Sequence, residues 1–187
     1  PRSPLFPYTT LFRSAGGSLP LAGGQGVEAP AATPVETIPF DQTDLLANIL
    51  DDTPEGRLNV SNEALTALLY YTKLLTRGNY EALGIETLDE SRCDAISADP
   101  RSDRVAPLRA RGQVVAYSSR QRAGVKFTEF YGTLALDGGG NAHFAFTTPP
   151  DDAPEVGEYL MVEGVLVQML RAEALDGFVD APLIASR

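Results

Sequence analysis

The spacing of apolar residues changes near Leu108, and this change constrains the fold more than any other feature of the sequence. Before Leu108, apolar residues recur with the 3.6-residue period of a helix. After it, they alternate with a period of about two, which is typical of strands. The sequence therefore predicts an α+β protein, with a helical region at residues 40–106 and a β-rich domain at residues 107–187.

Four short helices are expected in the helical region, at residues 41–50, 59–77, 80–83 and 87–96. The second has the clearest apolar stripe, formed by Leu65, Leu68, Leu69, Thr72 and Leu75. Tyr70, Tyr71 and Leu74 are expected to widen this stripe. Gly78 is expected to end the helix, because glycine readily adopts the left-handed conformation of a C-terminal cap.

Five strands are expected after residue 107, at residues 108–118, 125–137, 142–148, 159–171 and 179–186. Residues 137–141, Asp-Gly-Gly-Gly-Asn, favour a hairpin because they tolerate positive φ. Gly112 and Gly164 fall inside strands, where glycine is costly unless the strand bulges or bends. This pattern predicts a five-stranded antiparallel β-barrel of the oligonucleotide/oligosaccharide-binding (OB) type. The alternative is a flat antiparallel sheet covered by the helices.

Two segments carry a resemblance to a known family. One is residues 45–54, Leu-Leu-Ala-Asn-Ile-Leu-Asp-Asp-Thr-Pro, followed by the helix with Tyr70 and Tyr71. The other runs from Asp99-Pro100 through Leu108-Arg109-Ala110-Arg111-Gly112-Gln113-Val114 to Ala181-Pro182-Leu183-Ile184. The chain resembles an uncharacterised bacterial family with helices ahead of an OB-like barrel. The resemblance implies no activity or catalytic residues, and it implies a membrane anchor upstream. This chain has Asp103-Arg104-Val105 where members often carry Arg-Gly.

Residues 5–14, Leu-Phe-Pro-Tyr-Thr-Thr-Leu-Phe-Arg-Ser, are identified as translated sequencing adapter, so residues 1–14 are set apart as an artefact. Residues 15–39 are rich in Gly, Ala and Pro and are expected to form a disordered linker. The natural N-terminus is then expected to be missing, and with it any signal or anchor. The compartment stays open, with a membrane-anchored or extracytoplasmic location as one expectation.

The net charge of −10 lies mainly in the N-terminal half. Residues 15–107 hold six Lys/Arg against fifteen Asp/Glu, whereas residues 108–187 hold seven against ten. This acidity argues against broad electrostatic binding of nucleic acid or anionic lipid by the whole chain.

Residues that could carry catalysis or hold a metal are scarce. The chain has one histidine, His143, and one cysteine, Cys93. One His and one Cys cannot supply the three or four ligands of a zinc site, and a Ser-His-Asp triad would depend on His143 alone. We therefore expect no enzyme activity, no cofactor and no metal.

A basic cluster at the first predicted strand pair is the one indication of ligand binding. Alternation places Phe127 and Tyr131 on the outer face of their strand, with His143 beside them. Exposed rings beside cations are what proteins use to bind single-stranded nucleic acid. The candidate ligand-binding residues are Arg111, Arg120, Arg122, Lys126, Phe127, Tyr131 and His143.

The alternative for these aromatic residues is that they pack across strands or beneath the helices. The sequence thus favours a non-enzymatic binding or interaction module, with its partner unknown. A protein or envelope component and single-stranded nucleic acid are both candidate ligands. A structural, membrane-tethered envelope protein is the second hypothesis.

Overall fold

The computed structural model describes residues 39–47, 49, 62–121, 128–147, 154–174 and 177–186. The predicted adapter, and the predicted linker up to residue 38, lie outside these residues. The elements, in chain order, are α1 (Thr43–Leu46), α2 (Asn62–Leu74), α3 (Arg77–Ala82), β1 (Glu86–Thr87), α4 (Glu90–Ala98), β2 (Pro107–Gln121), β3 (Thr128–Leu136), β4 (Asn141–Phe146), β5 (Tyr159–Ala174) and β6 (Gly177–Ser186). The α+β prediction is therefore confirmed.

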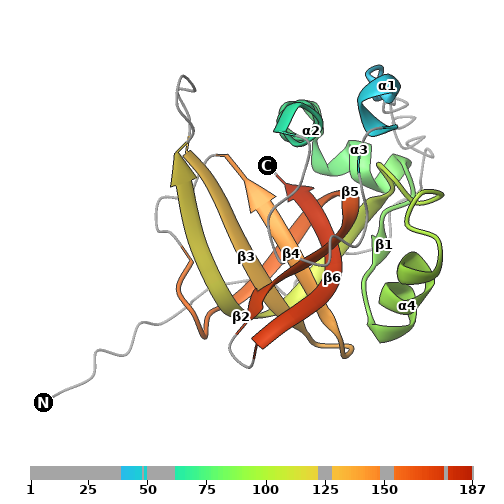
Figure 1. Ribbon diagram of the computed structural model, residues 1–187. Coiled ribbons are helices and arrows are strands. Elements are labelled where there is room, and N and C mark those ends of the chain that lie inside the picture. Colours follow the sequence, from blue (N-terminus) through green and yellow to red (C-terminus); the bar gives the residue numbers. More distant parts are fainter. Residues whose placement is uncertain are drawn as a thin grey trace, which may run out of the picture. The chain divides into compact units, whose positions relative to one another are not determined.

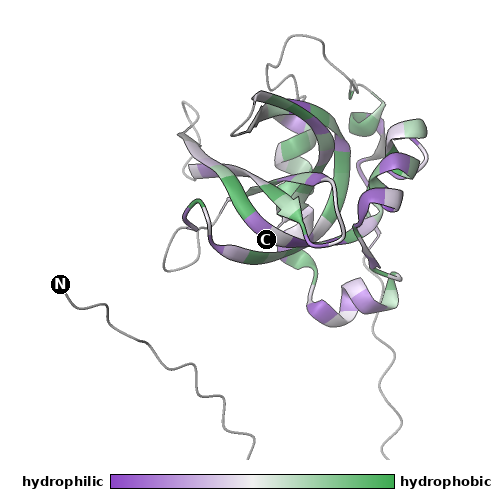
Figure 2. Ribbon diagram, turned by 90° about the horizontal axis from the view of Figure 1, so that it is seen from below, coloured by the Kyte–Doolittle hydropathy of each residue, from purple (hydrophilic) through white to green (hydrophobic). Residues whose placement is uncertain are grey.

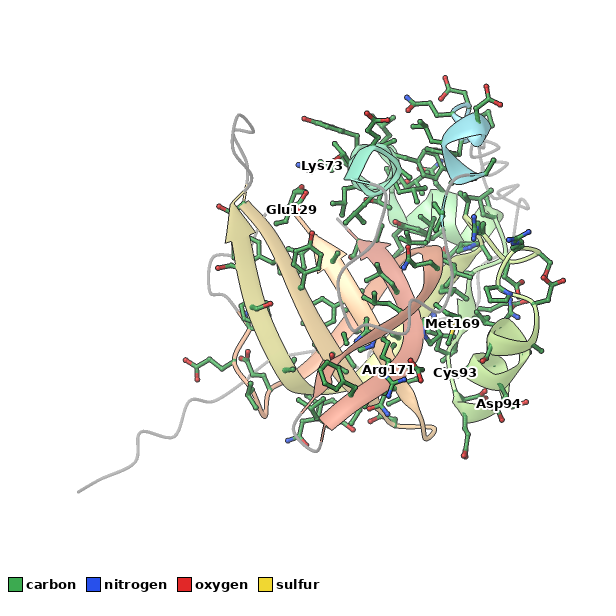
Figure 3. All side chains as sticks on the ribbon, viewed as in Figure 1. Lys73, Cys93, Asp94, Glu129, Met169 and Arg171 are labelled. Atoms are coloured by element: carbon green, nitrogen blue, oxygen red, sulfur yellow. The ribbon has the colours of Figure 1, made fainter. Side chains whose placement is uncertain are left out.

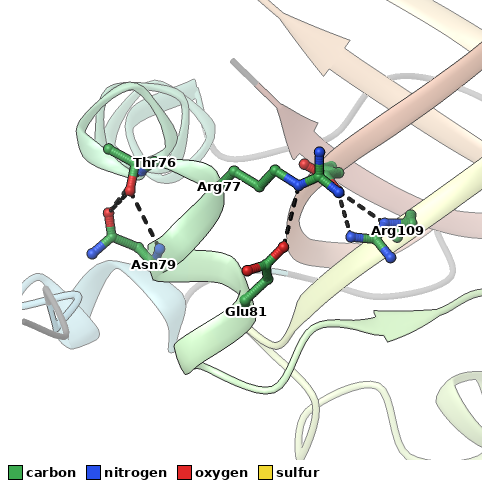
Figure 4. Close-up of polar contacts among 6 residues, drawn as sticks. Thr76, Arg77, Asn79, Glu81 and Arg109 are labelled. Carbon is green, nitrogen blue, oxygen red and sulfur yellow. Dashed lines mark hydrogen bonds and ion pairs between the residues drawn. The ribbon is translucent and has the colours of Figure 1, made fainter. Parts of the chain in front are cut away.

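The sequence predicted one helix over residues 59–77, but in the structure α2 ends at Leu74 and a new helix, α3, begins at Arg77. Thr76 caps α3: its hydroxyl accepts from the backbone N–H of Asn79, and the Asn79 side chain accepts from the backbone N–H of Thr76 at 2.7 Å. Figure 4 shows the contacts of the Thr76 side chain with Asn79, together with the exposed Arg77–Glu81 ion pair of the same helix. Gly78 therefore lies inside α3, and the expectation that it ends the preceding helix is wrong.

The six strands form one sheet in the order β1-β2-β3-β4-β6-β5, and β2 also pairs with β5. Strands β2 to β6 therefore close into a ring, which Figure 1 shows beside the helices. The closing pair runs from Pro107↔Val165 to Gln113↔Tyr159 and excludes the flat sheet. The β4–β6 and β1–β2 pairs are parallel, so the expectation of a wholly antiparallel sheet is wrong.

Two glycines allow the ring to close. A Cβ on Gly112 would overlap the carbonyl oxygen of Ala135 on β3, and a Cβ on Gly164 would overlap that of Ala185 on β6. The register shifts a few positions later in each strand, between Val114 and Ala116 in β2 and between Leu166 and Gln168 in β5. Bulges of this kind bend strands, and the glycines let the neighbouring backbones approach closely.

Apolar side chains on the two faces of the ring form two cores. The inner core draws on every strand from β2 to β6, and Leu88 and Ile96 from the α4 region also contribute to it. Its strand residues include Val114, Leu134, Phe144, Leu166 and Ile184. Figure 2 shows hydrophobic residues recurring along the curved strands. The outer core lies between the ring and the helices, where leucines of α2 meet residues such as Leu183 and Ala185 of β6.

Candidate functional site

Tyr131, a predicted ligand-binding residue, faces away from the inside of the ring as its place in β3 predicted, but it is not exposed. Its exposed fraction is 8 %, and it belongs to the outer core together with the leucines of α2. Its hydroxyl donates to the carboxylate of Glu129 at 2.5 Å. Of the two arrangements that the sequence left open, the structure shows the packed one for Tyr131: alternation along the strand predicted the face, and α2, which covers this face, buries the ring.

His143 is likewise buried, with an exposed fraction of 2 %. Its Nε2 lies 3.1 Å from the carbonyl oxygen of Val179, which can only accept, so Nε2 donates. Its Nδ1 then accepts from the hydroxyl of Thr133 at 2.8 Å. Burial lowers the pKa of His143 below 6.5 and keeps the ring neutral. Both ring nitrogens are therefore used in holding β3, β4 and β6 together.

Arg111 is the one exposed member of the predicted site whose side chain the structure describes. Its guanidinium lies 6.0 Å from the centre of the Tyr159 ring, and its Nε lies 3.2 Å from the Asp137 carboxylate. The Tyr159 hydroxyl donates to the same carboxylate. Arg111 therefore already has an acidic partner and an aromatic partner within the protein.

The predicted site does not assemble among the described residues. The cross-strand partner of Tyr131 is Ser118, seven positions along β2 from Arg111. Arg120 lies in β2 without a described side chain, and Arg122, Lys126 and Phe127 lie outside the described residues. The structure thus separates Arg111 from Tyr131 and places Tyr131 and His143 in packed surroundings.

A groove between α1 and α2 is the concave surface that the sequence did not predict. Its volume is about 750 Å³. It is lined by Pro39, Phe40, Asp41, Gln42, Leu45, Glu63, Thr66, Ala67, Tyr70, Tyr71 and Leu74. Pockets that hold ligands commonly range from about 300 to 1,000 Å³ and are mainly apolar. The groove is therefore large enough to receive several side chains of a partner.

The two faces of α2 explain how the groove forms. One face, with Leu65 and Leu68, is fully buried in the outer core. The opposite face carries Tyr70 and Leu74, whose exposed fractions are 56 % and 61 %. These residues are four positions apart and so lie one above the other on the helix surface. The sequence predicted that Tyr70, Tyr71 and Leu74 would all widen the buried stripe. Of these three, Tyr71 does so, with an exposed fraction of 6 %, and the prediction is wrong for Tyr70 and Leu74.

Aromatic and polar contacts hold the walls of the groove in place. Phe40 packs edge-on against Tyr71, with ring centres 5.3 Å apart and planes at 66°. Arg104, from the segment between α4 and β2, donates to the carbonyl oxygens of Leu46 and Ile49, the latter at 2.9 Å. These bonds secure the end of α1, where backbone acceptors lack helical partners. Arg104 is a positioning residue that sequence reasoning missed, because its partners are backbone atoms more than fifty positions away.

The charged residues among those lining the groove are both acidic. Asp41 precedes α1 and Glu63 lies in the first turn of α2, and both are exposed. Lys73, beside the groove, holds its ammonium group 5.8 Å from the centre of the Tyr70 ring. The groove thus combines a mainly apolar lining with two exposed acidic side chains.

Cys93 gives no sign of reactivity. Its thiol donates to the carbonyl oxygen of Asn141 at 3.6 Å, and burial raises its pKa to about 11. Figure 3 shows Cys93 on the ring side of α4 and Asp94 on the side away from the ring. A thiol with a raised pKa is mostly protonated at neutral pH and is a poor nucleophile. Its role here is packing between α4 and the β3–β4 hairpin.

Among the residues that the structure describes, no three His, Cys, Asp or Glu side chains come together in a way that could hold a metal ion. None of the helices in the described ranges is both long and apolar enough to span a bilayer.

Comparison with protein-family models and with curated proteins found no match to this chain. The resemblance to a bacterial family therefore stays a prediction.

Proposed function

We propose that the protein is a non-enzymatic interaction module that binds a segment of a partner protein in the groove between α1 and α2. The observation that carries this proposal is the exposed pair Tyr70 and Leu74 beside a groove of about 750 Å³. Large apolar side chains exposed next to a concave surface are typical of protein interaction sites. A groove of this kind suits the apolar side of a helix or a short extended segment.

We further propose that the ring is an OB-type barrel that serves as a scaffold. The strand order supports this, because the ring contains five strands and its first strand, β2, pairs with both β3 and β5. In OB barrels the second and third strands commonly offer the ligand-binding face. Here Tyr131 and Ala145, on the corresponding strands β3 and β4, pack in the outer core with the leucines of α2. This packing favours the outer face of the helices over the strands as the binding surface.

Selection of peptides on the purified protein tests the groove. A displayed library of random 16-residue peptides is panned on the wild type, and the affinity of each selected peptide is measured by fluorescence anisotropy. We expect binders whose affinity falls about tenfold or more with Tyr70→Ser and Leu74→Ser, because both changes remove apolar contact area. Both residues are exposed, so both variants should fold normally.

Met161→Ser is the matched control, because Met161 is 55 % exposed on β5 and does not line the groove. It should leave the affinities unchanged. The proposal fails if panning yields no peptide that depends on Tyr70 or Leu74, or if Met161→Ser weakens binding as much as they do.

A further inference from the structure

The rim of the groove indicates the chemistry of its occupant. Asp41 and Glu63 both line the groove, and no Lys or Arg is among its lining residues. A third carboxylate, Asp44, lies exposed in the first turn of α1. Two lining carboxylates beside an apolar floor would lose part of their hydration when an apolar segment covers them, and this loss is costly unless a positive charge meets them.

Glu63 lies in the first turn of α2, where the helix dipole favours a negative side chain. A partner that covers this carboxylate therefore meets a negative charge that a Lys or Arg side chain would complement.

We infer that the groove binds a segment of a partner protein that carries bulky apolar side chains followed or preceded by Lys or Arg. The apolar side chains contact Tyr70, Tyr71 and Leu74, and the basic side chains reach Asp41 or Glu63. From Glu63 to Leu74 the helix rises roughly 16 Å, at about 1.5 Å per residue. The apolar and basic residues of the partner thus lie within about three helical turns of one another. This inference rests on the proposed function and names the partner's chemistry.

The peptides selected on the groove test the inference directly. We expect Lys and Arg to be enriched beside the apolar positions of those peptides that depend on Leu74. Synthetic copies with Lys or Arg replaced by Gln should bind the wild type about fivefold more weakly. The double variant Asp41→Asn/Glu63→Gln should bind the original and the replaced copies equally. Raising the salt concentration should reduce the difference on the wild type, because partly exposed charges are screened.

Asp94→Asn/Glu81→Gln is the matched control for charge. It removes the same two negative charges from exposed positions on α4 and α3 that do not line the groove. If this control abolishes the preference for basic peptides, the preference comes from the net charge and the inference is wrong.

Failure of the inference is distinguishable from failure of the proposed function. Peptides that depend on Leu74 but show no basic preference, or bind Asp41→Asn/Glu63→Gln unchanged, overturn the inference and leave the groove as a binding site. The absence of any peptide that depends on Tyr70 or Leu74 overturns both.

Discussion

The outer face of the ring and the outer face of α2 carry similar side chains in different surroundings. Tyr131 on β3 and Tyr70 on α2 both point away from the inside of the ring, yet their exposed fractions are 8 % and 56 %. The first is covered by α2, whereas the second lies on the far side of the same helix. An aromatic side chain on an outer face is therefore available to a partner only where the protein's own elements leave it uncovered.

The largest difference is expected between Tyr131→Ala and Tyr70→Ala. Tyr131→Ala should lower the free energy of unfolding by about 3–5 kcal/mol, because it removes a buried ring and the hydroxyl that donates to Glu129. Tyr70→Ala should change it by less than about 0.5 kcal/mol. Urea denaturation followed by circular dichroism measures both. Similar costs for the two changes would mean that α2 does not cover β3 as described.

A smaller difference in the free energy of unfolding is expected between the substitutions of two arginines. Arg104→Gln should lower the free energy of unfolding by about 1–3 kcal/mol, because two carbonyl acceptors at the end of α1 lose a charged donor. It should also weaken groove-dependent peptides, since α1 forms one wall of the groove. Arg111→Gln, which breaks an exposed ion pair on the strands, should cost less than about 1 kcal/mol and leave peptide binding unchanged. Equal effects on peptide binding would argue against α1 as a wall.

The smallest effect is expected in the pH dependence of stability. The pKa of His143 is lower in the folded protein than in the unfolded chain, so below about pH 6.5 the unfolded chain binds a proton that the folded protein does not. Stability should therefore fall as the pH drops below 6.5, with a slope of at most about 1.4 kcal/mol per pH unit for one proton.

The variant His143→Gln isolates this effect, because the chain has one histidine. Its free energy of unfolding should change little with pH between about pH 5 and 6.5, because Asp and Glu side chains in unfolded peptides are mostly ionised in this range. Thermal melts across this range measure the difference. An unchanged slope in the variant would show that His143 is not the group that titrates.

The sequence predicted the features that depend on local pattern. The five ring strands followed from alternation and from the Gly-rich hairpin, whose Gly139 and Gly140 have positive φ. The face on which Tyr131 lies also followed from alternation. Gly112 and Gly164 were singled out as points where a strand bulges or bends. The register shifts lie a few positions later, and at the glycines themselves the neighbouring backbones approach closely.

The features that the sequence could not predict depend on tertiary contacts. Tyr70 and Leu74 look like an extension of the apolar stripe of α2, and only the packing of the helix decides that they remain exposed. Arg104 finds its backbone partners through folding alone. The end of α2 was missed for a different reason: Thr76 offers a strong N-terminal cap for a new helix, and this outweighs the stop that Gly78 would otherwise provide.

The closing pair of the ring has a consequence for how the protein folds. Pro107 pairs with Val165, 58 positions later in the chain, whereas β2 and β3 meet across a single loop. Closing so long a loop costs chain entropy before the new contacts repay it, and folds dominated by such pairings form slowly. We therefore expect the β2–β3 and β3–β4 hairpins to form early and the β2–β5 seam to form late. The outer core takes its strand residues from β3, β4, β5 and β6. These four strands are successive neighbours in the sheet without the β2–β5 seam, so we expect the helices to pack on them before the ring closes.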